Sequence, residues 1–345
     1  MLKALGQEIE LRKNYLAEET IETIYFGGGT PSLLSADELQ ILIGAITDLY
    51  EVSPTAEITL EANPDDLNPQ KVREFRQTLI NRFSIGIQSF FEDDLKWMNR
   101  AHTAREAQSS IKRVQDAGFE NITADLIYGF PLLSNPKWEH NIQQLIELQI
   151  PHISSYSMTV EPATALSSFI KKGEQKPMDE GQSTAQFLIL MEQLIEAGFE
   201  HYEISNFAKP GLYSKHNSNY WEGVSYLGIG PSAHSFNGES RQWNISNNSN
   251  YIDQIGLKKI PAEIEVLSTE NRINEYIMTS LRTSKGMSLQ KITERFGSDY
   301  SNEVRDGLEP FADKNWINLK DQIVTLTTDG KLFADHIASE LFINT

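Results

Sequence analysis

Residues 27–32 read Gly-Gly-Gly-Thr-Pro-Ser and stand between an apolar stretch and a helical one. Consecutive glycines let the backbone approach a ligand closely, so this loop is a candidate binding element. It lacks the third glycine of a dinucleotide-binding fingerprint at the required offset, and it lacks the Lys-Ser/Thr pair of a P-loop. Considered alone, the loop is better explained as a strained turn.

Three further polar side chains follow or lie within the next apolar stretches. Glu61 follows Ile-Thr-Leu, Gln88 follows Ile-Gly-Ile, and Asp125 lies within Ala-Asp-Leu-Ile. Each residue alone is readily explained as a cap or a loop hydrogen bond. Because the carboxyl ends of parallel strands meet at one mouth of a barrel, where active sites lie, the glycine loop and these three residues together predict a ligand site.

The segments that must position these residues alternate between strand and helix patterns. Repeated strand–helix units predict an α/β fold with a parallel sheet, either a barrel or a doubly wound layer. A helical pattern also opens the sequence at Leu2. The expected strands are 21–26, 56–60, 83–87, 122–127 and 153–156, and the expected helices are 36–50, 69–79, 92–98, 103–117, 137–148 and 182–197.

A different pattern follows Trp243 and divides the chain into residues 1–243, a linker at 244–260, and a carboxy-terminal domain at 261–345. The polar stretch 244–250 is typical of a connecting loop. Three helices and a β-ribbon then predict a winged-helix-like domain. This domain carries 9 Lys or Arg against 14 Asp or Glu, which favours a structural or protein-contact role over DNA binding. The expected elements are helices 270–282, 288–296 and 302–314 and strands 316–320 and 323–326.

The composition excludes several classes of function. The chain has 345 residues and a formal charge of −18, which opposes binding to nucleic acids and anionic membranes. No apolar run approaches the roughly 20 residues that span a bilayer, and no signal-peptide pattern opens the chain, so a cytoplasmic location is expected. The sequence contains no cysteine, which excludes disulfides, thiolate nucleophiles and a cluster held by its own thiolates.

Four motifs together resemble the oxygen-independent coproporphyrinogen oxidase family of the radical S-adenosylmethionine (SAM) superfamily. They are Tyr-Phe-Gly-Gly-Gly-Thr-Pro-Ser at 25–32, Glu-Ala-Asn-Pro at 61–64, Ser-Ile-Gly-Ile-Gln-Ser-Phe at 84–90 and Asp-Leu-Ile-Tyr-Gly-Phe-Pro at 125–131. The resemblance implies a partial (β/α)6 barrel without its first strand. It also implies a SAM site made by Gly28, Gly29, Thr30, Glu61, Gln88, Arg100 and Asp125.

These residue types suit SAM. Carboxylates and an amide accept hydrogen bonds from an amino group and from ribose hydroxyls, and an arginine clamps a carboxylate. Arg100 lies between two expected helices and is equally compatible with a solvated surface charge.

A fifth motif resembles the HemW branch of this family, whose members bind haem and pass it to respiratory proteins. It is His-Asn-x-x-Tyr-Trp, formed by His216, Asn217, Tyr220 and Trp221. A histidine flanked by aromatic rings can ligate haem iron while the rings pack on the porphyrin. Without the resemblance, the better explanation is that Tyr220 and Trp221 are core residues beneath a loop and that His216 is solvated.

The resemblance predicts a haem chaperone that binds haem and SAM and delivers haem to acceptor proteins. One alternative is a coproporphyrinogen III dehydrogenase, which removes two propionate carboxyls by radical chemistry with SAM. Another is a cluster-less protein that binds SAM or haem.

Family members carry a Cys-x-x-x-Cys-x-x-Cys loop that holds a [4Fe-4S] cluster, and this sequence has no such motif. The expectation is a chain shortened at its amino terminus, which performs no radical chemistry in this form. A missing first strand leaves residues 21–26 at an edge of the sheet. Exposed edges promote association, so a homodimer is a further expectation.

Overall fold

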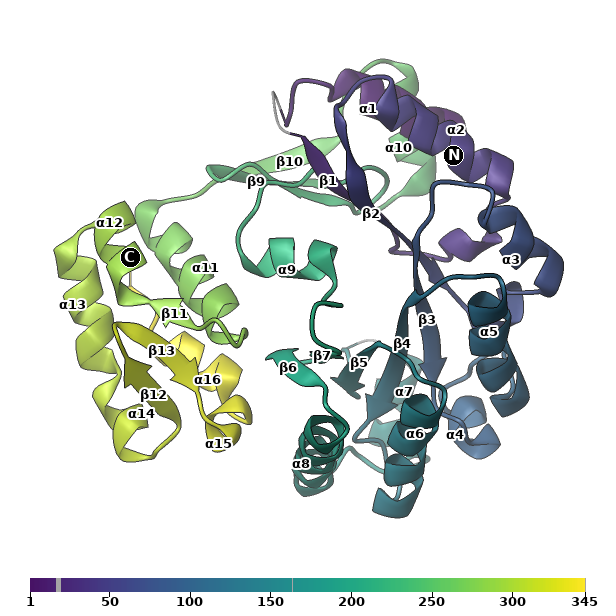
Figure 1. The fold of residues 1–345 in the computed structure, drawn as a ribbon. Coiled ribbons are helices and arrows are strands. Elements are labelled where there is room, and N and C mark those ends of the chain that lie inside the picture. The colour runs from purple at the N-terminus through teal and green to yellow at the C-terminus, as the bar shows by residue number, and fades with distance from the viewer. Residues whose placement is uncertain (17–19, 163, 345) are drawn as a thin grey trace.

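The computed structural model describes residues 1–16, 20–162 and 164–344. One curved sheet forms the body of the molecule, with strand order β1-β2-β3-β4-β5-β7-β6 (Figure 1). Strands β1 to β5 run parallel, and β7 and β6 complete the sheet in antiparallel pairs. The bounds are β1 (Ile21–Phe26), β2 (Val52–Ala62), β3 (Arg82–Gln88), β4 (Asn121–Tyr128), β5 (His152–Ser157), β6 (Glu200–Glu203) and β7 (Asn206–Ala208). The predicted α/β partial barrel is confirmed.

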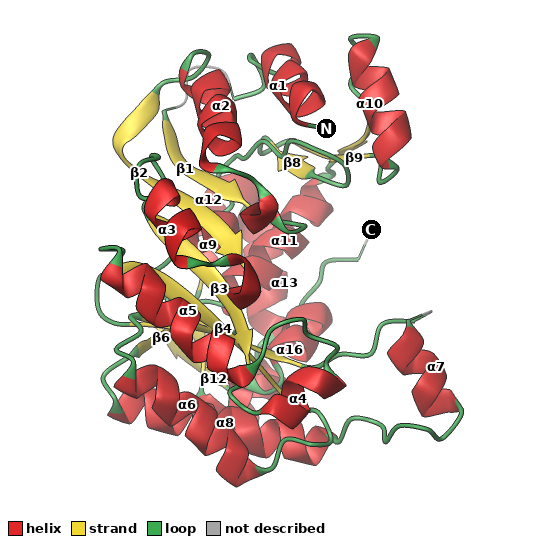
Figure 2. Ribbon diagram, turned by 90° about the vertical axis from the view of Figure 1, so that its right-hand side faces the viewer, coloured by secondary structure: helices red, strands yellow, loops and turns green. Residues whose placement is uncertain are grey.

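Helices cover the convex face of this sheet, as Figure 2 shows in a view turned from Figure 1. The helix that follows the glycine loop begins at a capping box, in which Ser35 and Glu38 satisfy each other's backbone N–H groups. No helix within the described residues is long and apolar enough to cross a membrane. The helices of this part are α1 (Leu2–Leu11), α2 (Ala36–Thr47), α3 (Pro69–Phe75), α4 (Glu92–Trp97), α5 (Ala104–Asp116), α6 (Asn135–Glu147), α7 (Ala165–Lys171) and α8 (Glu180–Glu196), with short 3-10 turns η1 (Pro31–Leu33) and η2 (Pro64–Asp66).

Side chains of the central strands alternate between an apolar and a polar face. Leu60, Phe83 and Leu126 belong to the buried core beneath the helices. Their neighbours along each strand point to the opposite, concave face, because successive side chains of a strand alternate in direction. The residues on that face are polar in every central strand: Glu57, Thr59, Glu61, Arg82, Ser84, Thr123, Asp125, His152 and Ser154. A polar barrel interior is therefore available for binding.

A second, three-stranded sheet and two helices follow β7. The sheet has the order β10-β9-β8, made by β8 (His234–Phe236), β9 (Ser240–Asn244) and β10 (Ala262–Val266). Helix α9 (Lys215–Trp221) contacts β1, and α10 (Asn248–Gly256) packs on α1. The expected loop at 244–250 is wrong beyond residue 247, because the Asn247 side chain accepts the Asn250 N–H and caps α10. Tyr251 and Ile255 of that helix are buried.

The carboxy-terminal region has its own apolar core and contains the expected helices and ribbon. The single helix expected at 302–314 is two helices, because Pro310 cannot donate the hydrogen bond that would continue the first. The elements are α11 (Thr269–Leu281), β11 (Met287–Ser288), α12 (Leu289–Phe296), α13 (Ser298–Gly307), α14 (Glu309–Asp313), β12 (Ile317–Lys320), β13 (Ile323–Leu326), α15 (Thr328–Lys331) and α16 (Ala334–Glu340).

Candidate functional site

The carboxyl ends of β1 to β4 surround a cavity of about 200 Å³. Six residues singled out in the sequence line it: Gly29, Thr30, Glu61, Gln88, Arg100 and Asp125. The seventh, Gly28, adjoins them because its backbone N–H donates to Glu61 Oε2 at 3.3 Å. The fold therefore brings together residues that are separated by up to 97 positions in the chain.

At Gly27 the glycine loop lies too close to Tyr25 and Glu61 to accommodate a side chain. A Cβ atom on Gly27 would lie 2.6 Å from the Tyr25 ring and 2.7 Å from Glu61 Oε1. Gly28 has φ of +78°, in the left-handed region that favours glycine. These two constraints explain the glycines at positions 27 and 28, and they leave the loop backbone facing the cavity.

Two carboxyl groups line the cavity, that of Glu61 on β2 and that of Asp125 on β4. Glu61 Oε1 accepts the Tyr25 hydroxyl at 2.7 Å, and the Ser84 hydroxyl donates to Asp125 at 3.4 Å. Loss of solvation and, to a smaller extent, the neighbouring Glu61 charge raise the pKa of Asp125 to about 7, against an opposing effect of Arg82. A cationic group placed between these carboxyls would favour their ionised forms.

Gln88 and Arg100 form the opposite wall of the cavity. Gln88 is buried at φ of +65°, and its amide lies close to Gly86, where a Cβ atom would be 2.8 Å from Gln88 Nε2. Arg100 donates from Nη2 to Asn63 Oδ1 at 3.2 Å, and it forms no ion pair among the described residues. Burial lowers the pKa of Arg100. Arg100 is thus a half-buried cation at the cavity, available to a carboxylate.

His216 lies on α9, against the inner face of β1. Its Nδ1 is 3.0 Å from Thr23 Oγ1, and its ring stacks on Tyr25 with centroids 4.6 Å apart and planes 19° apart. Backbone N–H groups of Lys215 and His216 donate to Glu57 at 3.1 and 3.0 Å, which fixes the start of α9. Desolvation lowers the pKa of His216, so its ring is neutral at pH 7.

The other members of the motif lie further along α9. The backbone N–H of Asn217 donates to the Ser214 hydroxyl, which caps the helix. Tyr220 is 46% exposed and meets the Trp221 ring edge-on, with centroids 5.4 Å apart. Trp221 stands under the guanidinium of Arg282. The alternative in which Tyr220 is a core residue and His216 is solvated is wrong.

Four residues of this region were given no role from the sequence, although Tyr25 and Asn63 lie within motifs quoted above. Thr23 and Tyr25 hold His216, Glu57 holds the start of α9, and Asn63 holds Arg100. The sequence does indicate that Thr23 and Tyr25 act together, because positions 23 and 25 share one face of a six-residue strand. Their partner on α9 lies 193 residues away from Thr23, and no local pattern predicts such a pairing.

Comparison with known proteins places the chain in a family. A family model described as the radical SAM superfamily matches residues 6–145, and one described as the HemN C-terminal domain matches residues 267–333. The chain is 34% identical over 338 residues to the heme chaperone HemW of Bacillus subtilis, covering 97% of this chain and 89% of that protein. It belongs to the HemW family. The heme chaperone HemW of Lactococcus lactis is 31% identical, over 94% of this chain and 86% of that protein.

The fold of this HemW-family chain is also that of a solved radical SAM enzyme. Coproporphyrinogen III oxidase (HemN) from Escherichia coli superposes with a TM-score of 0.82, covering 99% of this chain and 82% of the enzyme. Sequence identity in that comparison is 21%. The similarity therefore establishes the partial barrel, and the identity of the HemW relatives establishes the family.

The residues of this HemW-family chain do not fit a [4Fe-4S] cluster, which the superfamily implies. The sequence contains no cysteine to supply thiolate ligands. Within the described residues, no group of three His, Asp or Glu side chains is placed to hold a metal ion.

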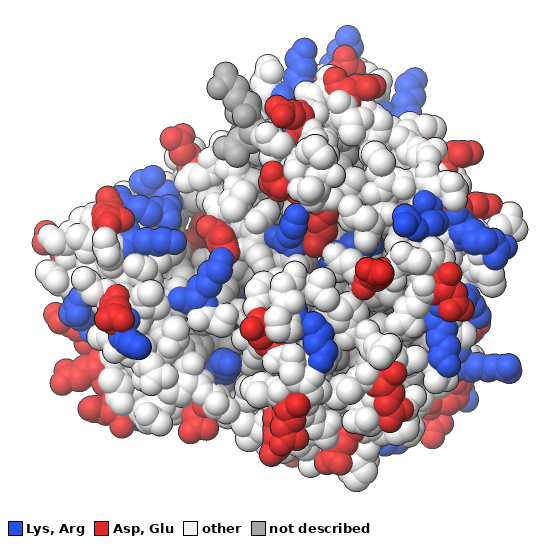
Figure 3. All heavy atoms as spheres, viewed as in Figure 1, with Lys and Arg blue, Asp and Glu red and all other residues white. Residues whose placement is uncertain are grey.

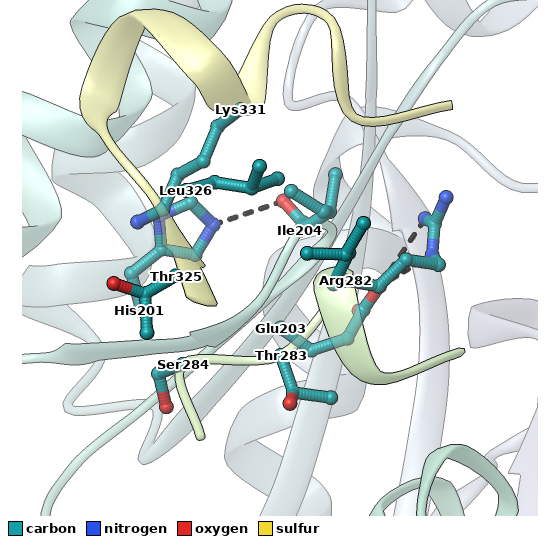
Figure 4. A pocket seen from close by; sticks show the side chains of 10 residues that line it. His201, Glu203, Ile204, Arg282, Thr283, Ser284, Thr325, Leu326 and Lys331 are labelled. Carbon is teal, nitrogen blue, oxygen red and sulfur yellow. Dashed lines mark hydrogen bonds and ion pairs between the residues drawn. The ribbon is translucent and has the colours of Figure 1, made fainter. Parts of the chain in front are cut away.

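A second cavity of about 200 Å³ lies at the junction with the carboxy-terminal region (Figure 4). There His201 Nε2 lies 3.0 Å from the carbonyl of Ile204, so it must be the protonated nitrogen. His201 Nδ1 therefore accepts the Lys331 ammonium at 2.9 Å. Burial lowers the pKa of His201 to about 3. This neutral histidine links the partial barrel to α15 of the HemW-family fold.

Proposed function

We propose that this protein is a haem chaperone whose haem iron is ligated by His216. The observation that carries the proposal is the setting of this histidine: Nδ1 is engaged by Thr23, and Nε2 forms no hydrogen bond to any described residue. A metal-ligating histidine normally has one nitrogen held by a second group and the other directed to the metal. The exposed ring of Tyr220 on the same helix is available to a porphyrin face.

SAM is the proposed second ligand, bound in the cavity at the ends of β1 to β4. Its ammonium would lie between Glu61 and Asp125, whose carboxyls line the cavity and can accept its hydrogen bonds. Its carboxylate would pair with Arg100, and Gln88 would bond the ribose. The backbone of Gly28, Gly29 and Thr30 would enclose the ligand at closest approach. These assignments rest on the family relation and on the donors and acceptors present.

The test of haem binding is a titration with haem, followed by the Soret absorbance. We expect a shifted Soret band in the unaltered protein, and a loss of haem affinity of at least tenfold in His216→Ala. His140→Ala is the matched control, because His140 is exposed on α6 and far from β1 in the chain. Equal affinity of the two variants would show that His216 is not the iron ligand.

The alternative of a coproporphyrinogen III dehydrogenase has less support. That reaction depends on a cluster, and this sequence has no cysteine to hold one. The similarity to the E. coli oxidase, at 21% identity, extends to the fold alone. The cluster-less binding protein differs from the chaperone in lacking haem transfer to an acceptor. Transfer of bound haem to an apo-acceptor protein, measured by the acceptor's absorbance, separates these two.

Four expectations from the sequence stay predictions within this proposal. Delivery to respiratory proteins, a homodimer and a cytoplasmic location are three of them. The fourth is the division of the chain into 1–243, 244–260 and 261–345. In the structure, β10 of the third segment pairs with β9 of the first, so a cut at residue 260 would break that sheet.

A further inference from the structure

Two residues of β1, Thr23 and Tyr25, connect the candidate haem ligand to the candidate SAM cavity. Thr23 engages His216 Nδ1, and Tyr25 stacks on the same ring while its hydroxyl donates to Glu61. We propose that Thr23 and Tyr25 are positioning residues through which SAM at Glu61 tightens the binding of haem at His216. This inference rests on the proposed function, because it requires both ligands.

Thr23 decides which nitrogen of His216 faces a ligand. A neutral imidazole that binds iron through Nε2 carries its proton on Nδ1. In that tautomer Nδ1–H donates to Thr23 Oγ1, across the 3.0 Å separation of the two atoms. The hydrogen bond fixes the ring orientation and increases the electron density on the ligating nitrogen. Thr23 thus acts on the iron through the histidine.

Tyr25 is held too tightly to move independently of its neighbours. Its hydroxyl lies 2.7 Å from Glu61 Oε1, and its ring lies where any Cβ on Gly27 would collide with it. The other carboxylate oxygen of Glu61 accepts the Gly28 N–H. A ligand that fixes Glu61 therefore also fixes Tyr25, and through ring stacking it fixes His216.

The coupling between the two ligands is expected to be positive, because SAM orders His216 before haem binds. Haem binding then costs the protein less conformational entropy, which produces positive cooperativity. Coupling between two ligand sites is reciprocal, so haem must tighten SAM binding by the same factor. Typical couplings change an affinity by about 5- to 150-fold. We expect a value near the lower limit here, because the two sites are connected mainly through the single side chain of Tyr25.

The role of Thr23 is tested with Thr23→Val, which keeps the shape of the side chain and removes its hydroxyl. In the ferrous haem complex, the iron–histidine stretching band in resonance Raman spectra should move to lower frequency. Thr23→Ser restores a hydroxyl and should return the band. A purely structural role would change stability without moving this band. A band that stays in place in Thr23→Val overturns the role assigned to Thr23.

The coupling is tested by haem titration with and without saturating SAM. In the unaltered protein we expect SAM to lower the haem dissociation constant about fivefold. Tyr25→Phe keeps the stacked ring and removes the bond to Glu61, so the ratio of the haem dissociation constants without and with SAM should fall from about five to about one. Tyr300→Phe is the matched control, because it removes another Tyr–Glu hydrogen bond of 2.7 Å, in the carboxy-terminal region.

The outcomes separate this inference from the proposed function. Calorimetry of SAM binding accompanies each titration. If SAM binds but leaves haem affinity unchanged, or if Tyr25→Phe keeps the full effect, the coupling is overturned and the haem chaperone stands. If SAM fails to bind, the proposed SAM site and the coupling both fail, while haem ligation by His216 stands. If His216→Ala binds haem normally, the proposed haem ligand and the coupling both fail.

Discussion

At the scale of single residues, the carboxyls of Glu61 and Asp125 define the chemistry of the strand-end cavity. Glu61 lies on β2 and Asp125 on β4, both on the concave face of the sheet, and the Glu61 charge contributes to the raised pKa of Asp125. Such a pair binds a cation better than a neutral group. Because the pKa of Asp125 is raised in the folded protein, the stability of the ligand-free protein should depend on pH.

Asp125 should make the ligand-free protein less stable as the pH rises from 5 to 7.5. Its pKa is about 7 in the folded protein against 3.8 for an unperturbed Asp, so the folded state holds a proton that the unfolded state has released in this range. The unfolding free energy then falls with pH. Relative to Asp125→Asn, we expect a loss of about 2–3 kcal/mol, measured by urea unfolding at both pH values.

The exposed Asp48, at the end of α2, supplies the control for this measurement. Asp48→Asn should follow the pH dependence of the unaltered protein. A constant difference between the unaltered protein and Asp125→Asn across the range would mean that Asp125 is ionised throughout. SAM, if bound between the carboxyls, should reduce the dependence because its ammonium favours the charged form.

Residues at strand ends were predictable from sequence, whereas the contacts of His216 were not. Glu61, Gln88 and Asp125 each follow or lie in an apolar stretch, and parallel topology necessarily gathers their positions at one mouth. His216 meets Thr23 and Tyr25 only because α9 folds back onto β1. The sequence motif singled out His216 as a candidate iron ligand, which stays a prediction, while the orientation of its ring depends on tertiary packing.

At the scale of elements, the five parallel strands were predictable because burial requires apolar stretches of strand length. Helix α9 was not, because its seven residues have no apolar repeat and none of them is buried. Its stability comes instead from the Ser214 cap and from Glu57, which accepts two backbone N–H groups. Asparagine-rich residues 247–250 were misinterpreted for a related reason, since the same side chains favour loops and helix caps.

At the scale of the whole molecule, the partial barrel and the carboxy-terminal region are joined by a polar junction. Positive and negative side chains intermingle on the face shown in Figure 3. At the junction, backbone bonds join Ile204 to Arg282 and Ser284 to Tyr202, at 3.0 and 2.9 Å. Arg282 also contacts Trp221, so α9 touches both parts of the molecule. The position of the carboxy-terminal region therefore affects the candidate haem element.

Arg282 should contribute more to stability than any exposed ion pair of the junction. It pairs with Glu203 at 3.2 Å, and the Glu203 side chain is only 1% exposed. Arg282→Met keeps most of the aliphatic volume but leaves this buried carboxylate without its cation. We expect the unfolding free energy to fall by about 2–3 kcal/mol, less than for a fully buried pair because Arg282 remains partly solvated. Equilibrium unfolding in urea measures the change.

Lys285→Met is the matched control, because Lys285 pairs with Glu222 across the same junction while both side chains are exposed. Exposed pairs contribute about 0–1 kcal/mol, so this variant should be nearly as stable as the unaltered protein. Glu203→Gln in the Arg282→Met background should recover much of the loss, since it removes the uncompensated charge and keeps the side-chain shape. If Arg282→Met and Lys285→Met lose equally little, solvent reaches Glu203, and the junction is held by its backbone bonds and apolar contacts rather than by this ion pair.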